Sequence, residues 1–261
     1  MRRYRDAKLR DIFMSTHYAH RGIHDSPDCP ENSLAAFKKA VDLGYGIELD
    51  VQESHDGKLV IHHDLDLERM TGLPGLVGST SYAHMRDRRL KETDQRIPTL
   101  AEVLALVDGQ VPLLIEVKSF LRPKRFAEEL RSILRGYQGP YMIESFNPWF
   151  LRRYYALDNR VWLGQLSQHF PDVLGRLFLS TLLCSAVSKP DFISYSIKAP
   201  NRFALWVCKT ILRKPLFGWT VRDDQAYQAH KGFFDLFIFE HIRPGKPDNA
   251  DMQRLMAQLE D

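Results

Sequence analysis

The stretch Gly46-Ile-Glu-Leu-Asp-Val51 alternates apolar and acidic side chains without a break. Successive side chains of a β-strand point to opposite faces, so this pattern predicts a strand whose three apolar side chains share one face. Glu48 and Asp50 share the other face. In a barrel the apolar face packs against outer helices, and the two carboxylates therefore point inward. Two buried like charges are costly unless a cation or strong hydrogen-bond donors compensate them.

The stretch Leu114-Ile-Glu-Val-Lys118 repeats this alternation. Ile115 and Val117 are expected to face outward, and Glu116 and Lys118 inward. Together the two stretches aim three carboxylates and one ammonium at the barrel interior, near the carboxyl ends of strands, where active sites of such barrels lie. An all-oxygen ligand set favours Mg²⁺ or Ca²⁺ over zinc. An internal salt-bridge network, with Lys118 neutralising part of the charge, is the alternative interpretation.

Short apolar segments alternate with amphipathic segments along the rest of the chain. Repeated β-then-α units predict a parallel sheet with helices outside it. A TIM (β/α)₈ barrel needs about 250 residues, so the 261 residues favour one closed barrel over an open doubly wound sheet. The expected strands are 16–22, 46–51, 58–62, 111–117, 140–145, 161–167, 191–197, 215–221 and 234–239. The expected helices are 33–43, 100–107, 124–135, 148–156, 171–187, 202–212, 224–230 and 248–259.

The stretch 64–98 interrupts the alternation, because it is rich in Gly, Arg and polar residues. It predicts a small insertion after an early strand, on the loop face of the barrel where ligands bind. We therefore expect a basic N-terminal arm over residues 1–15 and one barrel domain over residues 16–261. The arm has five basic residues among its first ten. A solvated segment is the expected state, and peripheral attraction to anionic lipid is the alternative.

Composition argues against several classes of protein. The net charge of +3 is only mildly basic, so no nucleic-acid partner is expected. The odd number of cysteines, Cys29, Cys184 and Cys208, argues against a disulfide framework. The N-terminus lacks the apolar stretch of a secretory signal. The most apolar run, 173–187, is interrupted by Arg176 and is shorter than the roughly 20 residues of a membrane-spanning helix. We expect a cytoplasmic protein.

Seven of the ten histidines fall within the first 84 residues. His20 ends the first expected strand and His63 ends the third. Histidine is the natural general acid or base near neutral pH, and two of them beside a metal could serve one displacement as base and acid. Arg21 has the guanidinium geometry that suits a pair of phosphate oxygens, with a surface salt bridge as the alternative. Glu31, just before the first helix, could orient Arg21 or contact the substrate.

Taken together, these motifs resemble the glycerophosphodiester phosphodiesterase family. The resemblance covers residues 16–221 and is dense before residue 120 and sparse after it. Its ordered pieces are His20-Arg-Gly22, Pro30-Glu-Asn32, Glu48-Leu-Asp-Val51, His63-Asp64, Arg69-Met-Thr71, Ile97-Pro-Thr-Leu100, Ile115-Glu-Val-Lys118, Ser145-Phe146 and Trp219-Thr-Val221.

The resemblance implies a TIM barrel with a small insertion, and a metal-dependent hydrolysis of small-molecule glycerophosphodiesters to glycerol 3-phosphate and an alcohol. Two histidines would act as the general acid and base, beside Mg²⁺ or Ca²⁺. The implied site residues are Glu48, Asp50 and Glu116 for the metal, His20 and His63 for catalysis, Arg21, Glu31 and Lys118 for the phosphate and its surroundings, and Trp219 for the alcohol side of the pocket.

Two regions depart from the family pattern. The last expected strand ends in Glu240-His-Ile-Arg-Pro244, where the family usually shows Thr-Asp before Pro. Residues 168–214 match no motif; outer-ring helices are expected there, and an apolar lip for an acyl chain is the sharper alternative. Three functional alternatives stay open: a lysophospholipase D with the same site, a non-catalytic phospholipid- or phosphate-binding barrel, and a sugar-phosphate enzyme that shares only the barrel.

Overall fold

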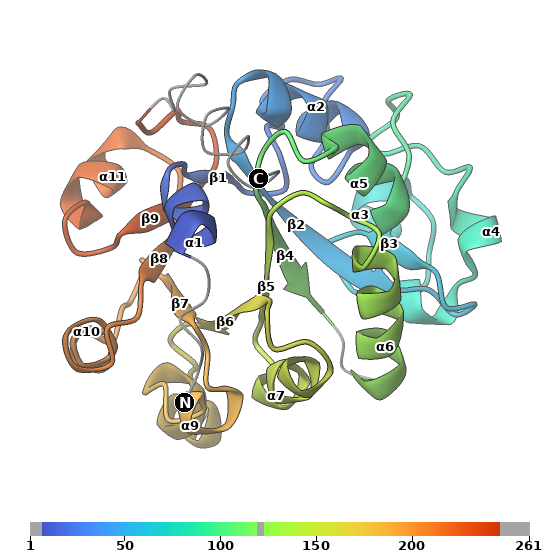
Figure 1. The fold of residues 1–261 in the computed structure, drawn as a ribbon. Coiled ribbons are helices and arrows are strands. Elements are labelled where there is room, and N and C mark those ends of the chain that lie inside the picture. Colours follow the sequence, from blue (N-terminus) through green and yellow to red (C-terminus); the bar gives the residue numbers. More distant parts are fainter. Residues whose placement is uncertain (1–6, 119–122, 246–261) are drawn as a thin grey trace.

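The computed structural model describes residues 7–118 and 123–245, and these form a closed ring of eight parallel strands with helices outside it (Figure 1). Neighbouring strands pair in chain order, and β1 closes the ring by pairing with both β2 and β9. The TIM barrel expected from the sequence is therefore confirmed. The ring strands are β1 (Tyr18–Ala19), β2 (Gly46–Glu53), β4 (Leu113–Val117), β5 (Tyr141–Ser145), β6 (Trp162–Ser167), β7 (Phe192–Ser196), β8 (Leu216–Val221) and β9 (Leu236–Phe239).

The strand expected over 58–62 exists as β3 (Leu59–Ile61), but it is not part of the ring. It pairs antiparallel with β2, as the return arm of a hairpin. Only five residues, 54–58, separate the two strands, and a parallel connection needs a dozen or more. The turn contains Gly57, whose φ of 86° lies in the left-handed region that favours glycine.

Five outer helices match the expected ranges to within a residue or two. Local capping explains several of their boundaries: Ser33 accepts a hydrogen bond at the start of α2, and Thr99 and Glu102 form a capping box at the start of α5. These helices are α2 (Leu34–Asp42), α5 (Leu100–Val107), α6 (Pro123–Leu134), α7 (Pro148–Leu157) and α11 (Asp224–His230). The helix expected over 248–259 lies outside the described residues.

The two remaining expected helices are less regular than predicted. The segment 171–187 divides into α8 (Val173–Gly175), the π-helical η2 (Arg176–Ser180) and α9 (Ser185–Ser188). Leu182 has a φ of 62°, which a continuing right-handed helix does not allow. The segment 202–212 begins as α10 (Arg202–Trp206) and continues with π-helical geometry as η3 (Val207–Ile211). No described helix is long and apolar enough to cross a membrane.

The amino-terminal end of the barrel is closed by α1 (Ala7–Met14), formed by residues expected to belong to the basic arm. Ile12 and Phe13 of this helix are buried, and the ring of Phe13 lies 5.6 Å from that of Trp162. Phe13 belongs to an apolar cluster inside the ring, to which Tyr18, Leu114, Met142, Phe192 and Phe217 also contribute. Because this end is filled with apolar side chains, polar chemistry is restricted to the opposite end.

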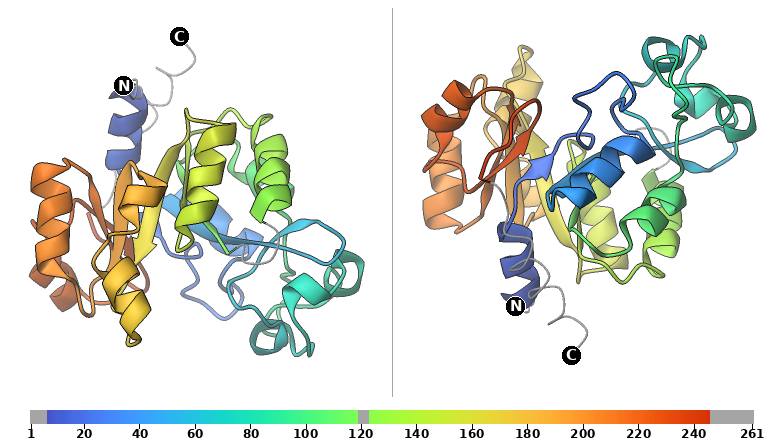
Figure 2. Two further views of the ribbon diagram at one scale, coloured as in Figure 1. Left: turned by 90° about the horizontal axis from the view of Figure 1, so that it is seen from below. Right: turned by 90° about the horizontal axis from the view of Figure 1, so that it is seen from above.

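The insertion after β3 has an apolar core of its own. It holds the short helices α3 (Glu68–Thr71), η1 (Val77–Ser79) and α4 (Tyr82–Met85). Figure 2 shows this segment beyond the end of the barrel that faces away from α1. Its irregular sequence therefore builds a structured rim rather than a repeat of the barrel pattern. The cluster inside it consists of Val60, Leu67, Met70, Val77, Met85, Leu90 and Ile97.

Candidate active site

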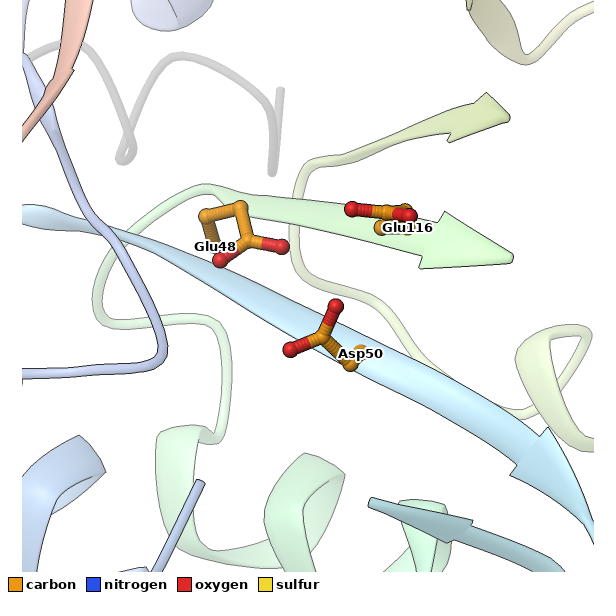
Figure 3. A group of neighbouring side chains, drawn as sticks. All are labelled: Glu48, Asp50 and Glu116. Carbon is orange, nitrogen blue, oxygen red and sulfur yellow. The ribbon is translucent and has the colours of Figure 1, made fainter. Parts of the chain in front are cut away.

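Three buried carboxylates meet at the carboxyl end of the barrel. Glu48 and Asp50 project inward from β2, and Glu116 projects from β4, where it lies in register with Asp50. One oxygen of each carboxylate lies within 4.8 Å of the others. Figure 3 shows the three side chains converging from the two neighbouring strands. The strand alternation predicted this convergence.

Cations and donors compensate the three carboxylates unequally. Lys118 Nζ lies 3.1 Å from Asp50 Oδ1 and 2.7 Å from Glu116 Oε1, and Arg21 Nε lies 3.4 Å from Asp50 Oδ2. Asn32 Nδ2 also donates to Asp50 Oδ2 at 2.8 Å. Burial opposes ionisation of Asp50, yet these two cations hold its pKa well below the usual range. Asp50 is therefore the ionised centre of the group.

Glu48 lacks comparable compensation. The backbone N–H of Arg21 donates to Glu48 Oε2 at 2.9 Å, while Oε1 is buried and has no hydrogen-bond partner among the described residues. Burial raises the pKa of Glu48, and the neighbouring Asp50 and Glu116 raise it further. Burial and Asp50 also raise the pKa of Glu116, although Lys118 opposes them. An unpartnered oxygen inside an all-oxygen cluster fits a hard divalent cation better than a complete salt-bridge network.

His20, which follows β1, is held by a carboxylate that sequence reasoning missed. Its Nδ1 contacts Glu240, which follows β9, and its Nε2 lies 3.9 Å from Glu48 Oε2. Glu240 is fixed in turn by Arg222, whose Nε donates to it at 2.6 Å. Burial lowers the pKa of His20 to about 4, although the hydrogen bond to Glu240 opposes that shift. The signal available in the sequence was an acidic residue at the end of the strand that closes the ring beside β1.

His63 is oriented through a chain of ion pairs between the insertion and the barrel. Its Nδ1 lies 2.7 Å from Asp64 Oδ1, and Asp64 is paired with Arg69 of α3. Arg69 Nη2 lies 2.7 Å from Glu31 Oε1, and the same oxygen lies 2.7 Å from Arg21 Nη1. Burial opposes ionisation of Glu31, but Arg69 and Arg21 lower its pKa to about 2. Glu31 thus links Arg21 to the loop that carries His63.

A cavity of about 330 Å³ brings most of the predicted residues together. Both histidines line it, and so do Arg21 and Lys118. Asp50 and Glu31 do not line the cavity and lie behind it, in contact with Arg21. The other lining residues from the predicted set are Glu48, Glu116 and Trp219.

A fourth acidic residue, Glu144 of β5, also lines the cavity and was not predicted. It is buried and pairs in register with Glu116 of β4, and the hydroxyl of Ser194 donates to it. Burial raises the pKa of Glu144 to about 8, with Glu116 and Asp50 adding to the shift. The alternation in Tyr141-Met-Ile-Glu-Ser145 contained the signal, since it places Met142 and Glu144 on the inward face.

Fold and site together define a class: TIM-barrel proteins that place an acidic cluster and two histidines around one cavity. The family model of the glycerophosphoryl diester phosphodiesterase family matches residues 20–242. The chain belongs to this family, which confirms the resemblance found in the sequence.

Individual relatives agree with this assignment. A glycerophosphodiester phosphodiesterase of Caldanaerobacter subterraneus is 38% identical over 162 residues, which cover 58% of this chain and 65% of that protein. The chain therefore spans just under two thirds of that relative. The human lysophospholipase D GDPD1 is 26% identical over 264 residues, covering 88% of this chain and 83% of that protein. A phosphodiesterase of Oleispira antarctica, solved with the product sn-glycerol-3-phosphate, has a TM-score of 0.75 at 22% identity, with 94% and 98% of the two chains covered, and it supports the fold.

Proposed function

We propose that the chain hydrolyses glycerophosphodiesters to glycerol 3-phosphate and an alcohol. The observation that carries the proposal is a single cavity lined by His20, His63 and the carboxylate cluster. Charge stabilisation and two proton-transfer groups are what phosphodiester cleavage requires. The product named for the Oleispira antarctica structure, sn-glycerol-3-phosphate, supports this substrate class.

Glu48, Asp50 and Glu116 would hold a divalent cation, Mg²⁺ or Ca²⁺. The unpartnered Glu48 Oε1 and the all-oxygen donor set fit such an ion. When bound, the cation supplies Lewis-acid stabilisation of the charge on the phosphodiester oxygens. Glu144 lies on the neighbouring strand, where its neutral form would add no further charge to the cluster.

Arg21 and Lys118 supply the fixed positive charges for the phosphate. Glu31 and Asp50 hold the Arg21 side chain, and Asp50 and Glu116 hold the Lys118 ammonium. Both cations are therefore oriented before the substrate arrives, which lowers the cost of reorganisation in the transition state. On the other side of the cavity, the half-buried Trp219 would pack against the alcohol part of the substrate.

The two histidines would move the protons. Each contacts a carboxylate through Nδ1, which leaves Nε2 for the substrate. One imidazole removes a proton from the attacking oxygen, a new phosphorus–oxygen bond forms, and the bond to the alcohol oxygen breaks. The other imidazole gives a proton to that departing oxygen. The attacking oxygen belongs to water, or to the glycerol 2-hydroxyl in a first step whose cyclic phosphate water then opens.

Release of glycerol 3-phosphate from glycerophosphocholine tests this proposal. We expect EDTA to stop release, and Mg²⁺ or Ca²⁺ to restore it. His20→Ala and His63→Ala should each lower kcat by about 10²-fold or more while the melting temperature is kept. Activity close to that of the unchanged protein in either variant would remove that histidine from the mechanism. His84→Ala, in the exposed part of the insertion, is the matched control.

A second candidate, a lysophospholipase D activity of the same site, has one observation in its favour. An aromatic series leads from the cavity to its edge: the ring of Trp219 lies 5.9 Å from that of Phe146, which lies 6.2 Å from that of Phe170. An acyl chain could lie against such a series. Hydrolysis of lysophosphatidylcholine, compared with glycerophosphocholine in the same preparation, separates the two activities. Cleavage of either substrate would exclude the alternative of a non-catalytic phospholipid- or phosphate-binding barrel.

A further inference from the structure

The helices that follow β5, β6 and β7 carry exposed apolar side chains where they begin. Trp149 in α7 is 66% exposed, Leu174 in α8 is 80% exposed and Phe203 in α10 is 74% exposed. A helix that follows a parallel strand begins beside the carboxyl end of that strand, which is the end that holds the cavity. Three consecutive units of the barrel thus present apolar side chains around one side of the cavity mouth.

Further exposed apolar residues extend this surface by one helical turn. Together the seven residues, here called the apolar rim, are Trp149, Val173, Leu174, Leu177, Phe178, Phe203 and Trp206. The rings of Phe203 and Trp206 stack at 6.3 Å. In Figure 2, α8 and η2 project beyond the same end of the barrel as the insertion, away from α1. A group of this size at one end of the molecule is typical of an interaction site, unlike single scattered apolar residues.

The charge around the apolar rim indicates what it contacts. Residues 146–214 contain ten basic and three acidic residues. Five of the basic residues, Arg160, Lys189, Lys209, Arg213 and Lys214, lie in the helix ends and loops that lead into the next strands, at the opposite end of the barrel, so only part of this charge surrounds the rim. Several of the basic residues lie at or near the helix starts: Arg152 in α7, Arg176 in η2, Lys198 before α10 and Arg202 at its first position. Exposed aromatic and aliphatic side chains flanked by Lys and Arg match the chemistry of an anionic lipid–water interface.

We propose that the apolar rim docks the protein on an anionic lipid surface, with the cavity mouth facing the headgroups. The exposed aliphatic and aromatic side chains enter the boundary between headgroups and acyl chains, and the basic residues contact lipid phosphates. Lys198 also lines the cavity, so the basic surface continues from the rim into the site. This interaction is a property of the surface and goes beyond the hydrolysis proposed above.

Sedimentation of the full chain with lipid vesicles tests the proposal without relying on catalysis. We expect binding to vesicles of phosphatidylcholine with phosphatidylglycerol, weaker binding to phosphatidylcholine alone, and loss of the difference at high salt. Leu174→Ser and Phe203→Ser should each weaken partitioning by about tenfold, since each removes one large apolar side chain from the contact. Both side chains are exposed, so the melting temperature should be kept.

Ile211→Ser is the matched control. Ile211 is 61% exposed but lies at the far end of η3, next to the loop that enters β8 at the amino-terminal end of the barrel. This variant should bind like the unchanged chain. The proposal is overturned if the unchanged chain does not sediment with anionic vesicles, or if Ile211→Ser loses as much binding as Leu174→Ser. It is also overturned if sedimentation equilibrium without lipid shows a dimer that Leu174→Ser and Phe203→Ser dissociate, because the rim would then be covered by a second copy.

Discussion

Glu240 offers the sharpest test of how the proposed site works, because it contacts the reacting histidine without lining the cavity. It accepts from His20 Nδ1, and Arg222 holds its other oxygen at 2.6 Å. Glu240→Gln keeps the size of the side chain but removes its charge. A hydrogen bond to a charged group contributes about 1.5–3 kcal/mol. Losing that contribution in the orientation of His20 corresponds to a decrease in kcat of about 10- to 100-fold, with KM little changed.

The pH profile distinguishes this positioning role from simple destabilisation. The contact with Glu240 raises the pKa of His20 against the effect of burial. Its removal should therefore move to lower pH the limb of the kcat profile of glycerophosphocholine hydrolysis that reports His20: the acidic limb if His20 is the base, and the basic limb if it is the acid. Glu240→Asp, which keeps the charge, should recover part of the rate. Arg222→Gln is the control, because it leaves the His20 contact in place and should cost less.

A kcat for Glu240→Gln within twofold of the unchanged chain, with the pH profile unmoved, would refute the reasoning. A parallel fall in melting temperature and in activity, equal for Glu240→Gln and Arg222→Gln, would show that Glu240 is only structural. Both measurements use the same purified variants, so the two outcomes can be separated directly.

Three further predictions concern the surroundings of the site and the opposite, amino-terminal end of the barrel. Arg69→Gln breaks the link between Glu31 and Asp64 and should lower kcat/KM by up to about tenfold; the effect is limited because Arg69 is partly exposed. Arg86→Gln is the control: it removes an exposed ion pair with Asp87 and should leave kcat/KM unchanged. Phe13→Ala should lower the free energy of unfolding by about 3–5 kcal/mol in denaturant titrations, because it leaves a cavity in the apolar cluster at the amino-terminal end of the barrel. Burial raises the pKa of Glu144 to about 8, above the pKa of the same group in the unfolded chain. Proton binding to Glu144 therefore stabilises the folded state. This contribution to the free energy of unfolding is complete below the unfolded pKa and is lost as pH rises through about 8. In EDTA, Glu144→Gln should flatten that decline, whereas an unchanged slope would contradict it.

The parts of the site that follow from strand alternation could be predicted from the sequence. Glu48 and Asp50 lie on one face of β2 because side chains alternate there, and Glu116 follows the same rule on β4. The rule places residues correctly wherever a strand is long enough to show a pattern. The barrel itself follows from the repetition of such strands between amphipathic helices.

Features that depend on contacts between distant segments could not be predicted in this way. Glu240 acts on a histidine 220 positions away, and nothing in the local pattern of β9 indicates that partner. The strand β3 looks like any other strand in the sequence, and only the length of its connection to β2 shows that it must run antiparallel. The insertion is built around a small apolar cluster whose residues follow no helical or strand period, so its short helices could not be predicted from hydrophobic periodicity.

The pairing of the first strand, β1, with the last, β9, determines when during folding the site becomes complete. His20 and Glu240 directly follow β1 and β9, and the pairing of these two strands closes the ring. A nascent or truncated chain without β9 would contain both histidines and the whole carboxylate cluster, and would still lack the group that aligns His20. The full rate of turnover would then appear only after closure, which joins the two ends of the barrel sequence and is slow because of its large loop-closure entropy. Activity measured during refolding would therefore follow completion of the ring, later than the growth of secondary structure.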